Sequence, residues 1–391
     1  MTLKHIIIST IALLAAICAS ANDGVYYTRG NHLVPLNETD ISIRKEVLTI
    51  TLTDNGYAMV DVYYEFWNPA TTTKRLLMGF EADPPYNDDY KFHPDGVHPN
   101  IKHFSVEMNG TPLPYRNAAC LADTNRLLPV DITKKYYVFG NSIVEESKFD
   151  VDADEPIDFD AAISIAYVYY FDADFHPGLN RVHHTYSYKL SVIAGIPYHL
   201  EYKLSPAGRW AGGIIDDFTL NICAHKTAKH FFVKNDAFAG ATFSLVDGAG
   251  KMRTSNHCDE QCTEVSLRNG TITLHINNFK PTEGHELSLT SADIYQVDTN
   301  GEYQFGNSYD RSSDVFLWVV RSERSKIEPS EPAKLKRVAR NLPYAHRGHI
   351  FKDPFLKHYF ESLWWYMPDP EYKDSDADFT DVDRAYIQFG K

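Results

Sequence analysis

Hydrophobic and polar residues alternate with a period of two over much of the chain. Residues 47–52 and 57–67 alternate in this way on either side of Asp54-Asn55-Gly56, a tripeptide typical of tight turns. Asn68-Pro69 ends the second run, because proline cannot donate to a strand ladder. The pattern predicts a β-hairpin followed by a third strand over residues 75–80.

Further strand-forming runs follow at short intervals to about residue 290. They lie at residues 104–108, 163–171, 181–190, 198–204, 214–222, 231–233, 242–246, 263–267, 271–276 and 287–289. Asn109-Gly110 and Asn269-Gly270 stand where hairpin turns are expected between two runs. Many short strands with little helical periodicity predict a mainly β fold, an antiparallel β-sandwich region over residues 22–320, as one domain or two.

The pattern changes after residue 320. Residues 321–333 are polar and charged with two prolines, which is typical of a linker. Apolar residues then recur at helical spacing, and Asp353-Pro354 suits a helix cap and first position. Thr380 and Asp383 have the spacing of a capping box. A small α-helical C-terminal domain over residues 334–391 is therefore expected.

Composition and charge narrow the function classes. The 25 Tyr and 22 Phe favour pleated, half-buried surfaces over helix bundles. The formal net charge of −14 argues against a general nucleic-acid binder or a protein that binds anionic membranes, because both depend on basic patches.

The first residues have the features of an export signal. Lys4 precedes an apolar run from Ile6 to Cys18, and Ala19-Ser20-Ala21 offers the small residues that signal peptidase reads. The run is too short for a membrane span, and no later segment reaches that length, so no transmembrane helix is expected. Residues 1–21 are predicted to be cleaved near Ala21, which places the mature chain in the periplasm or outside the cell. A lipid anchor at Cys18 is the alternative, although Ile17 stands where a small residue is favoured.

Four cysteines remain after cleavage. Cys120, Cys223, Cys258 and Cys262 are an even number in an oxidising compartment, so one or two disulfides are expected, and three pairings are open. His225 and His257 lie close to Cys223 and Cys258 in the sequence, so a metal site is the alternative interpretation. The spacing typical of zinc ligands is missing, however. We predict no metal and no cofactor.

Two other segments could carry chemistry. The acidic run over residues 150–160 lacks the Gly and the bidentate Glu of an EF-hand loop, so a solvated loop is preferred over an irregular calcium site. His183 and His184 are adjacent in a predicted strand and should point to opposite faces, which prevents them from sharing one metal.

A spaced set of residues near the C-terminus resembles a known family. It consists of Arg340-Asn341, Tyr344-Ala345, Gly348, Phe351, Tyr359-Phe360 and Trp365-Tyr366. In this order the set resembles the YARHG domain, a small module of bacterial extracytoplasmic proteins, over roughly residues 334–389. His346-Arg347 inverts the family's usual Arg-His order. The family has no agreed activity, so the resemblance implies a location rather than a reaction.

Two roles are open for the aromatic residues of this domain. They can fill the hydrophobic core of the domain. A domain of about 55 residues buries little surface and could barely form a core without them. Alternatively, exposed members can stack on a cell-wall glycan or peptide, in a groove that exposes at least two of them side by side. The candidate binding residues are Tyr344, Arg347, Trp364, Trp365 and Tyr366.

The N-terminal part is similar to a second bacterial family of exported proteins, known only as a domain of unknown function. The similarity rests on the start after Ala21, on Glu46, on Tyr64-Glu65-Phe66-Trp67-Asn68 and on Met78-Gly79-Phe80. It implies a β-rich secreted domain and no known chemistry.

No catalytic motif is present, so no catalytic residue is assigned. The favoured function is a non-enzymatic protein of the cell envelope that binds a cell-surface polymer or an envelope protein. The alternative is an envelope-acting hydrolase, with metal-assisted chemistry near His183, His184 or residues 150–160. A compact pocket of His and carboxylates would favour the enzyme, whereas a shallow aromatic surface would favour binding.

Overall fold

The computed structural model describes residues 34–35, 40–53, 55–82, 93, 95–121, 128–129, 134–139, 142–146, 163–193, 196–202, 204, 207–208, 210–224, 229–238, 240–257, 260–282, 285–291, 294–297, 303–304, 317–320, 332–375, 377, 379 and 381–389. The predicted signal, the acidic run over residues 150–160 and Cys258 lie outside these ranges. No helix among the described residues is long and apolar enough to cross a membrane.

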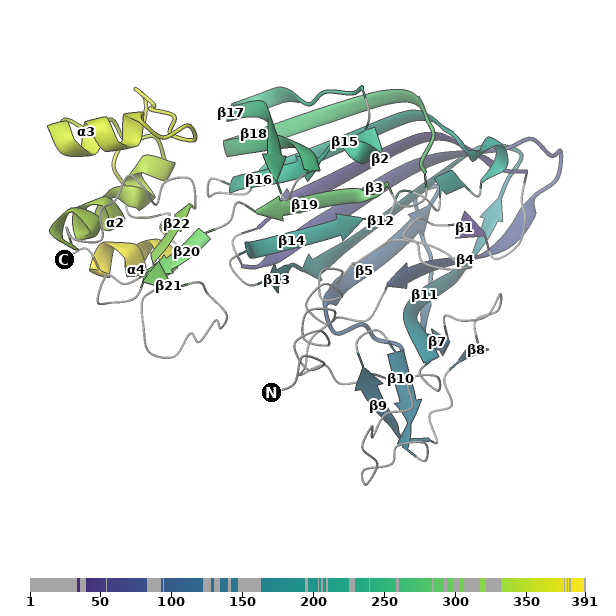
Figure 1. Ribbon diagram of the computed structural model, residues 1–391. Helices are drawn as coiled ribbons and strands as arrows, with labels where there is room; N and C mark the ends of the chain where they lie inside the picture. Colours follow the sequence, from purple (N-terminus) through teal and green to yellow (C-terminus); the bar gives the residue numbers. More distant parts are fainter. Residues whose placement is uncertain are drawn as a thin grey trace.

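Strands make up most of the described chain, and helices follow at its C-terminal end (Figure 1). The strands are β1 (Val34–Pro35), β2 (Ser42–Leu52), β3 (Tyr57–Asn68), β4 (Lys74–Ala82), β5 (Ile101–Met108), β6 (Thr111–Pro112), β7 (Arg116–Leu121), β8 (Leu128–Pro129), β9 (Tyr136–Phe139), β10 (Ser142–Glu145), β11 (Ile163–Phe175), β12 (Gly178–Lys189), β13 (Ser191–Ile193), β14 (Ile196–Tyr202), β15 (Ile215–Ala224), β16 (Lys229–Lys234), β17 (Ser244–His257), β18 (Glu260–Phe279), β19 (Leu287–Ser291), β20 (Ile294–Val297), β21 (Tyr303–Gln304) and β22 (Leu317–Val320). The helices are α2 (Pro332–His346), α3 (Pro354–Glu361) and α4 (Asp381–Phe389), and short 3-10 turns form at η4 (Ala211–Gly213) and η5 (Asp236–Phe238). The predicted mainly β fold with C-terminal helices is confirmed.

The largest element is a 12-stranded sheet, seen as the broad curved sheet in Figure 1. Its order is β13-β14-β19-β16-β18-β15-β2-β3-β12-β5-β6, and β17 lies along the other side of β18. Most neighbours are antiparallel, but β15 pairs in parallel with β2. The sheet is therefore mixed, because β2 is central and its two neighbours run in opposite directions.

A 7-stranded sheet, which includes β4 and β11, packs against one face of the large sheet. Phe80 of β4 contacts the rings of Phe104 and Tyr186, with centroids 5.1 and 5.0 Å apart. Tyr169 of β11 lies 4.9 Å from Phe104. Strand alternation places these rings on one side of each strand, so burial of the aromatic face holds the two sheets together.

The turn predictions were right at two places and wrong at a third. Gly56 and Gly110 have positive φ and close the hairpins β2–β3 and β5–β6. Asn269-Gly270 does not separate two strands, because it lies inside β18, which pairs with β17 on both sides of Gly270. Gly270 instead forms an irregularity inside the strand, with φ of +92°.

This irregularity decides which side chains of β18 share a face. Val265 and Leu267 are buried in the core before it, and Ile272 and Leu274 are buried after it. The shift from odd to even positions means that Glu264, Ser266, Arg268, Thr271, Thr273 and His275 all lie on the opposite face, which we term the outer face.

The C-terminal helices have a core of their own. Phe351, Phe360, Tyr359, Leu363 and Ala345 are buried together in it. Asp353 caps α3 by accepting a hydrogen bond from the backbone N–H of Leu356 at 3.0 Å, as its position before Pro354 predicts. Three predicted helices are confirmed, and α2 begins at Pro332, inside the segment expected to be a linker.

Candidate functional site

The helical domain contacts the outer face of the large sheet through the segment that follows α3. Lys251 Nζ donates hydrogen bonds to the carbonyl oxygens of Trp364 and Tyr366, at 3.1 and 2.9 Å. Ser266 Oγ donates to the carbonyl oxygen of Trp365 at 3.4 Å. Strands β17 and β18 thus bind three consecutive carbonyls, so this part of the contact depends on the backbone of the segment and not on its side chains.

Arg268 extends the contact by one residue. Its Nη1 donates to the carbonyl of Met367 at 2.9 Å, and its Nη2 lies 3.0 Å from the Asp369 carboxylate. Gly348 has φ of +92°, and a Cβ there would lie 2.3 Å from Arg268 Nη1. Gly348 therefore allows both the positive φ of the turn after α2 and the close approach of Arg268 from the sheet.

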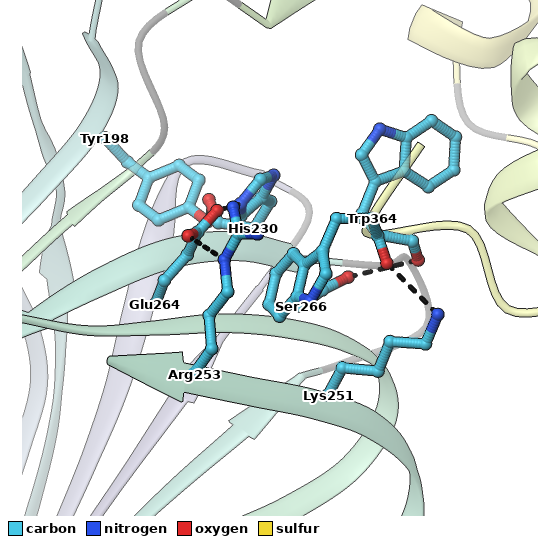
Figure 2. A network of polar contacts seen from close by, with 8 residues as sticks. Tyr198, His230, Lys251, Arg253, Glu264, Ser266 and Trp364 are labelled. Atoms are coloured by element: carbon cyan, nitrogen blue, oxygen red, sulfur yellow. Dashed lines mark hydrogen bonds and ion pairs between the residues drawn. The ribbon is translucent and has the colours of Figure 1, made fainter. Parts of the chain in front are cut away.

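The indole of Trp364 lies beside an ionic cluster of Arg253, His230 and Glu264, of which Glu264 is buried (Figure 2). The Arg253 guanidinium lies 4.4 Å from the indole centroid, and the His230 ring lies 5.7 Å from it. Below them Glu264, which is 4% exposed, accepts hydrogen bonds from Arg253 Nε at 2.6 Å and from His230 Nε2 at 2.9 Å. Tyr198 donates its hydroxyl to the carbonyl of His230 at 3.1 Å, which fixes β16 beside this cluster.

Glu264 is a carboxylate at neutral pH despite its burial. Burial alone would raise the pKa of its carboxyl, but the hydrogen bonds from His230 and Arg253 outweigh it and lower the pKa to about 2. The charge-assisted bonds hold both partners in position under Trp364. The cluster orders the surface that the helical domain covers.

Four of the predicted binding residues pack within the helical domain or at this junction. Trp365 and Tyr366 are buried, at 7% and 5% exposure. Tyr344 packs edge to face on Phe379 at 5.1 Å. Trp364 faces the sheet. The described residues do not expose two of these rings side by side, and their role in ligand binding stays a prediction.

The fifth candidate, Arg347, has a partner inside the domain. Its Nη2 lies 2.8 Å from Asp383 of α4, and its guanidinium lies 4.5 Å from the Phe379 ring. Arg347 Nη1 also donates to the carbonyl of Pro343 at 2.9 Å. These contacts close α2 onto α4. A role in binding an outside ligand stays a prediction for Arg347 as well.

Sequence reasoning missed the sheet residues of this junction. Glu264 lies in a predicted strand-forming run, where alternation predicts an ordinary solvated face, and Lys251, Arg253 and Arg268 lie outside the predicted runs. The sequence offers no local signal for them, because they are brought together by the pairing of β17 with β18.

Beyond the helical domain, the outer face continues across five strands as a surface that we term the open face. Its side chains include Asp217, Thr219 and Asn221 of β15, Lys45, Val47 and Thr49 of β2, Met59, Asp61, Tyr63, Glu65 and Trp67 of β3, Leu179, Arg181, His183 and Thr185 of β12, and Ser105 and Glu107 of β5. The strand register places Thr219, Val47, Tyr63, His183 and Glu107 in one row.

Ion pairs and hydrogen bonds link neighbouring rows of the open face. Lys45 Nζ lies 2.8 Å from Asp217, and this hydrogen bond lowers the pKa of the Asp217 carboxyl. The Tyr63 hydroxyl donates to Glu65 at 2.7 Å and accepts from Arg181 Nε at 3.1 Å. Side chains that hold one another in this way lose less freedom when a partner binds.

Apolar side chains interrupt the polar rows at defined points. Trp67 and Leu179 are direct neighbours across β3 and β12, and each is 40% exposed. Met59, also on β3, is 55% exposed. Large apolar groups that lie side by side and exposed on a polar sheet face are typical of contact surfaces.

The two adjacent histidines point to opposite faces, as predicted. His183 lies on the open face, with Nε2 3.1 Å from Asp61 and Nδ1 3.7 Å from Glu107. His184 is buried in the core, with its ring 5.9 Å from that of Tyr64. Among the described residues no group of three or more His, Cys, Asp or Glu is placed to hold a metal ion.

Three of the four predicted disulfide cysteines are described. Cys120 and Cys262 are buried and Cys223 is half-buried on β15, with its Sγ 3.4 Å from the Thr271 hydroxyl. No disulfide joins these three to one another. Pairings with Cys258 lie outside the described residues.

Comparisons with known proteins give domain matches and distant structural similarities. No curated protein matches the chain. Among solved structures, a candidate nutrient binding protein from Legionella pneumophila is 17% identical, covers 95% of this chain and 100% of its own, and has a TM-score of 0.44. An M1 zinc metallopeptidase from Deinococcus radiodurans is 11% identical, covers 78% of this chain and 54% of its own, and has a TM-score of 0.27. Baculovirus P35 is 11% identical, covers 64% and 97%, and has a TM-score of 0.22.

Two family matches agree with the resemblances seen in the sequence. Residues 21–156 match the domain of unknown function DUF4424. Residues 329–390, which include α2, α3 and α4, match the YARHG domain. The chain therefore combines an N-terminal DUF4424 region with a C-terminal YARHG domain that is docked on the outer face of the large sheet.

Proposed function

We propose that this chain is an exported, non-enzymatic protein of the cell envelope, and that its open face binds a cell-surface polymer. The predicted signal at residues 1–21 supports export, and the YARHG match supports an extracytoplasmic location. The open face supports binding, because it is a broad surface of paired polar groups with exposed apolar side chains.

The observation that carries the proposal is the pair Trp67 and Leu179 beside the linked charges of the open face. A flat indole buries the apolar face of a sugar ring or a peptide at low entropic cost. Fixed carboxylates, hydroxyls and guanidinium groups around it suit the hydroxyls and amides of a wall polymer. A cell-wall polymer is therefore favoured over an envelope protein as the partner.

Retention on isolated envelope material tests this proposal. The full chain is mixed with peptidoglycan and with whole envelope fractions, and bound protein is measured. We expect Trp67→Ala combined with Leu179→Ala to reduce retention by about tenfold or more, because central apolar contacts carry most binding energy. Tyr137→Ala is the matched control, since Tyr137 is 42% exposed on β9 of the other sheet.

The outcomes separate the candidate functions. Equal retention of the double variant and the wild type would overturn the role of the open face. Retention that is lost when the fraction is treated with protease, but survives removal of the glycan, would indicate an envelope protein as partner. Release of soluble fragments from the polymer would indicate the hydrolase.

A further inference from the structure

Positive side chains gather on one side of helix α2. These exposed residues are Lys334, Lys336, Arg337 and Arg340. Residues three or four positions apart are neighbours on a helix surface, so the cations share one side of α2, which we term the basic face. The other side of α2 packs into the core of the YARHG domain through Val338 and Ala339.

The basic face is unfavourable for the stability of α2 itself. The helix contains no Asp or Glu, and so has no acidic residue in its first turn. Like charges stand at helical spacing at positions 334 and 337, 336 and 340, and 337 and 340, and such pairs destabilise a helix. The helix dipole also disfavours cations near the N-terminal end. Because helix stability does not account for these cations, an anionic partner outside the helix is the better explanation.

Contacts with α3 hold part of the basic face in position. The Arg337 guanidinium and the Lys334 ammonium lie 5.3 and 5.6 Å from the centroid of the Phe355 ring. Arg337 Nη2 lies 2.8 Å from the carboxylate of Asp353, the residue that caps α3. Within the part of the chain that the structure describes, Arg340 has no ion-pair partner. Cations that are already held in place lose less freedom when an anion binds.

The charge distribution favours a thin anionic strand over a flat anionic membrane. The chain has a formal net charge of −14, so a membrane close to the molecule would be repelled by other parts of it. Salt screens exposed charges beyond about 10 Å at 0.1 M, so a strand along α2 would interact mainly with the basic face. The exposed side of α2 also lacks the large apolar side chains that membrane-surface helices bury in lipid.

We propose that the basic face of α2 binds a phosphate-bearing polymer of the cell surface. Positions 334 to 340 span about 9 Å along the helix axis, so the four cations suit a strand that carries negative charges at close intervals. Phosphates within the backbone of a polymer provide such intervals. Guanidinium groups bind phosphate through two parallel hydrogen bonds, and lysines add compact positive charges. This site lies on the YARHG domain and is separate from the open face.

Binding of fluorescently labelled inorganic polyphosphate to residues 22–391 tests the proposal. Fluorescence anisotropy over a series of salt concentrations gives the affinity and its salt dependence. We expect Lys336→Gln combined with Arg340→Gln to weaken binding by about tenfold. The slope of log affinity against log salt should fall by about one for each cation removed.

The control variant removes the same charge elsewhere. Lys189 and Lys373 are exposed and lie outside α2, so Lys189→Gln combined with Lys373→Gln should change the affinity by less than about twofold. Circular dichroism checks that each variant is folded. If the double variant of α2 does not fold, Arg340→Gln alone is used, and it should weaken binding by about threefold.

The outcomes decide between partners. Equal losses in the α2 variant and the control, or no binding of polyphosphate by the wild type, would overturn the proposal. Tighter binding of polyglutamate, or of phosphatidylglycerol vesicles, with the same dependence on Lys336 and Arg340 would overturn the phosphate polymer in favour of an acidic peptide or a lipid surface. The Trp67→Ala and Leu179→Ala double variant should bind polyphosphate like the wild type, so failure at α2 and failure at the open face are distinguishable.

Discussion

At the scale of single residues, Glu264 and Arg268 at the YARHG junction are matched by partners of opposite charge or by a carbonyl oxygen. Glu264 is almost fully buried, which is costly for a carboxylate unless it is paired and hydrogen-bonded. Arg253 and His230 supply both conditions. The arrangement keeps the sheet surface under Trp364 fixed. The free-energy cost of burying the Glu264 carboxylate is offset by two charge-assisted hydrogen bonds.

Glu264→Gln should lower the free energy of unfolding by about 2 kcal/mol at pH 7, because it removes two charge-assisted hydrogen bonds from a buried site. Glu65→Gln, on the open face, should cost only about 0.5 kcal/mol. Because the pKa of Glu264 is lowered to about 2, its contribution is fully present above the ordinary 4.5 and is lost as the pH falls toward 2. Urea unfolding at pH 7 and pH 3 measures both effects. An equal cost for the two variants would contradict this account.

At the scale of elements, β18 connects the core, the open face and the YARHG junction. Its first half pairs with β16 and its second half with β15, while β17 runs along its other side. Gly270 allows the strand to shift by one residue without leaving the ladder. Residues on both sides of the shift therefore share the outer face, which joins the junction to the open face.

Gly270→Ala tests this function of the strand. A Cβ at Gly270 would lie 2.2 Å from the backbone oxygen of Asp247, and the backbone has φ of +92°. We expect a loss of about 3 kcal/mol in the free energy of unfolding, measured in urea. Gly240→Ala has a similar φ of +84° but open space around the added Cβ, so it should cost only about 1 kcal/mol. Equal losses of unfolding free energy in the two variants would show that the close approach of Gly270 to Asp247 is unimportant.

At the scale of the whole molecule, the DUF4424 match ends before the sheet is complete. Residues 21–156 include β2 and β3, but β2 pairs with β15 and β3 pairs with β12, both of which come later in the chain. The aromatic core between the two sheets likewise needs β11 and β12. The matched region is thus one part of a larger folding unit.

A fragment of residues 22–156 should therefore not fold by itself. It would expose the apolar faces of β2, β3 and β4 and leave the ladder edges of β2 and β3 without their later neighbours. Circular dichroism during urea titration should show no cooperative transition for the fragment, whereas residues 22–391 should show one. A sharp transition in the fragment would instead mean that DUF4424 is an independent domain.

The sequence by itself determined the features that depend on residues close together in the chain. Asn55-Gly56 specified the β2–β3 hairpin, Asp353-Pro354 specified the start of α3, and the spacing from Arg340 to Tyr366 specified the YARHG domain. Local backbone preferences and local hydrogen bonds are sufficient for these features. The aromatic residues of the YARHG domain were also recognised, but two roles were left open for them.

The tertiary structure decided everything that depends on distant partners. Asn269-Gly270 has the same local signal as Asn55-Gly56, yet its role inside β18 was set by pairing with β17. Lys251 and Trp364 are 113 residues apart, and no local pattern marks them as partners. A strand residue that faces water and one that faces another domain have the same alternation. Only the position of the domain on the sheet tells them apart.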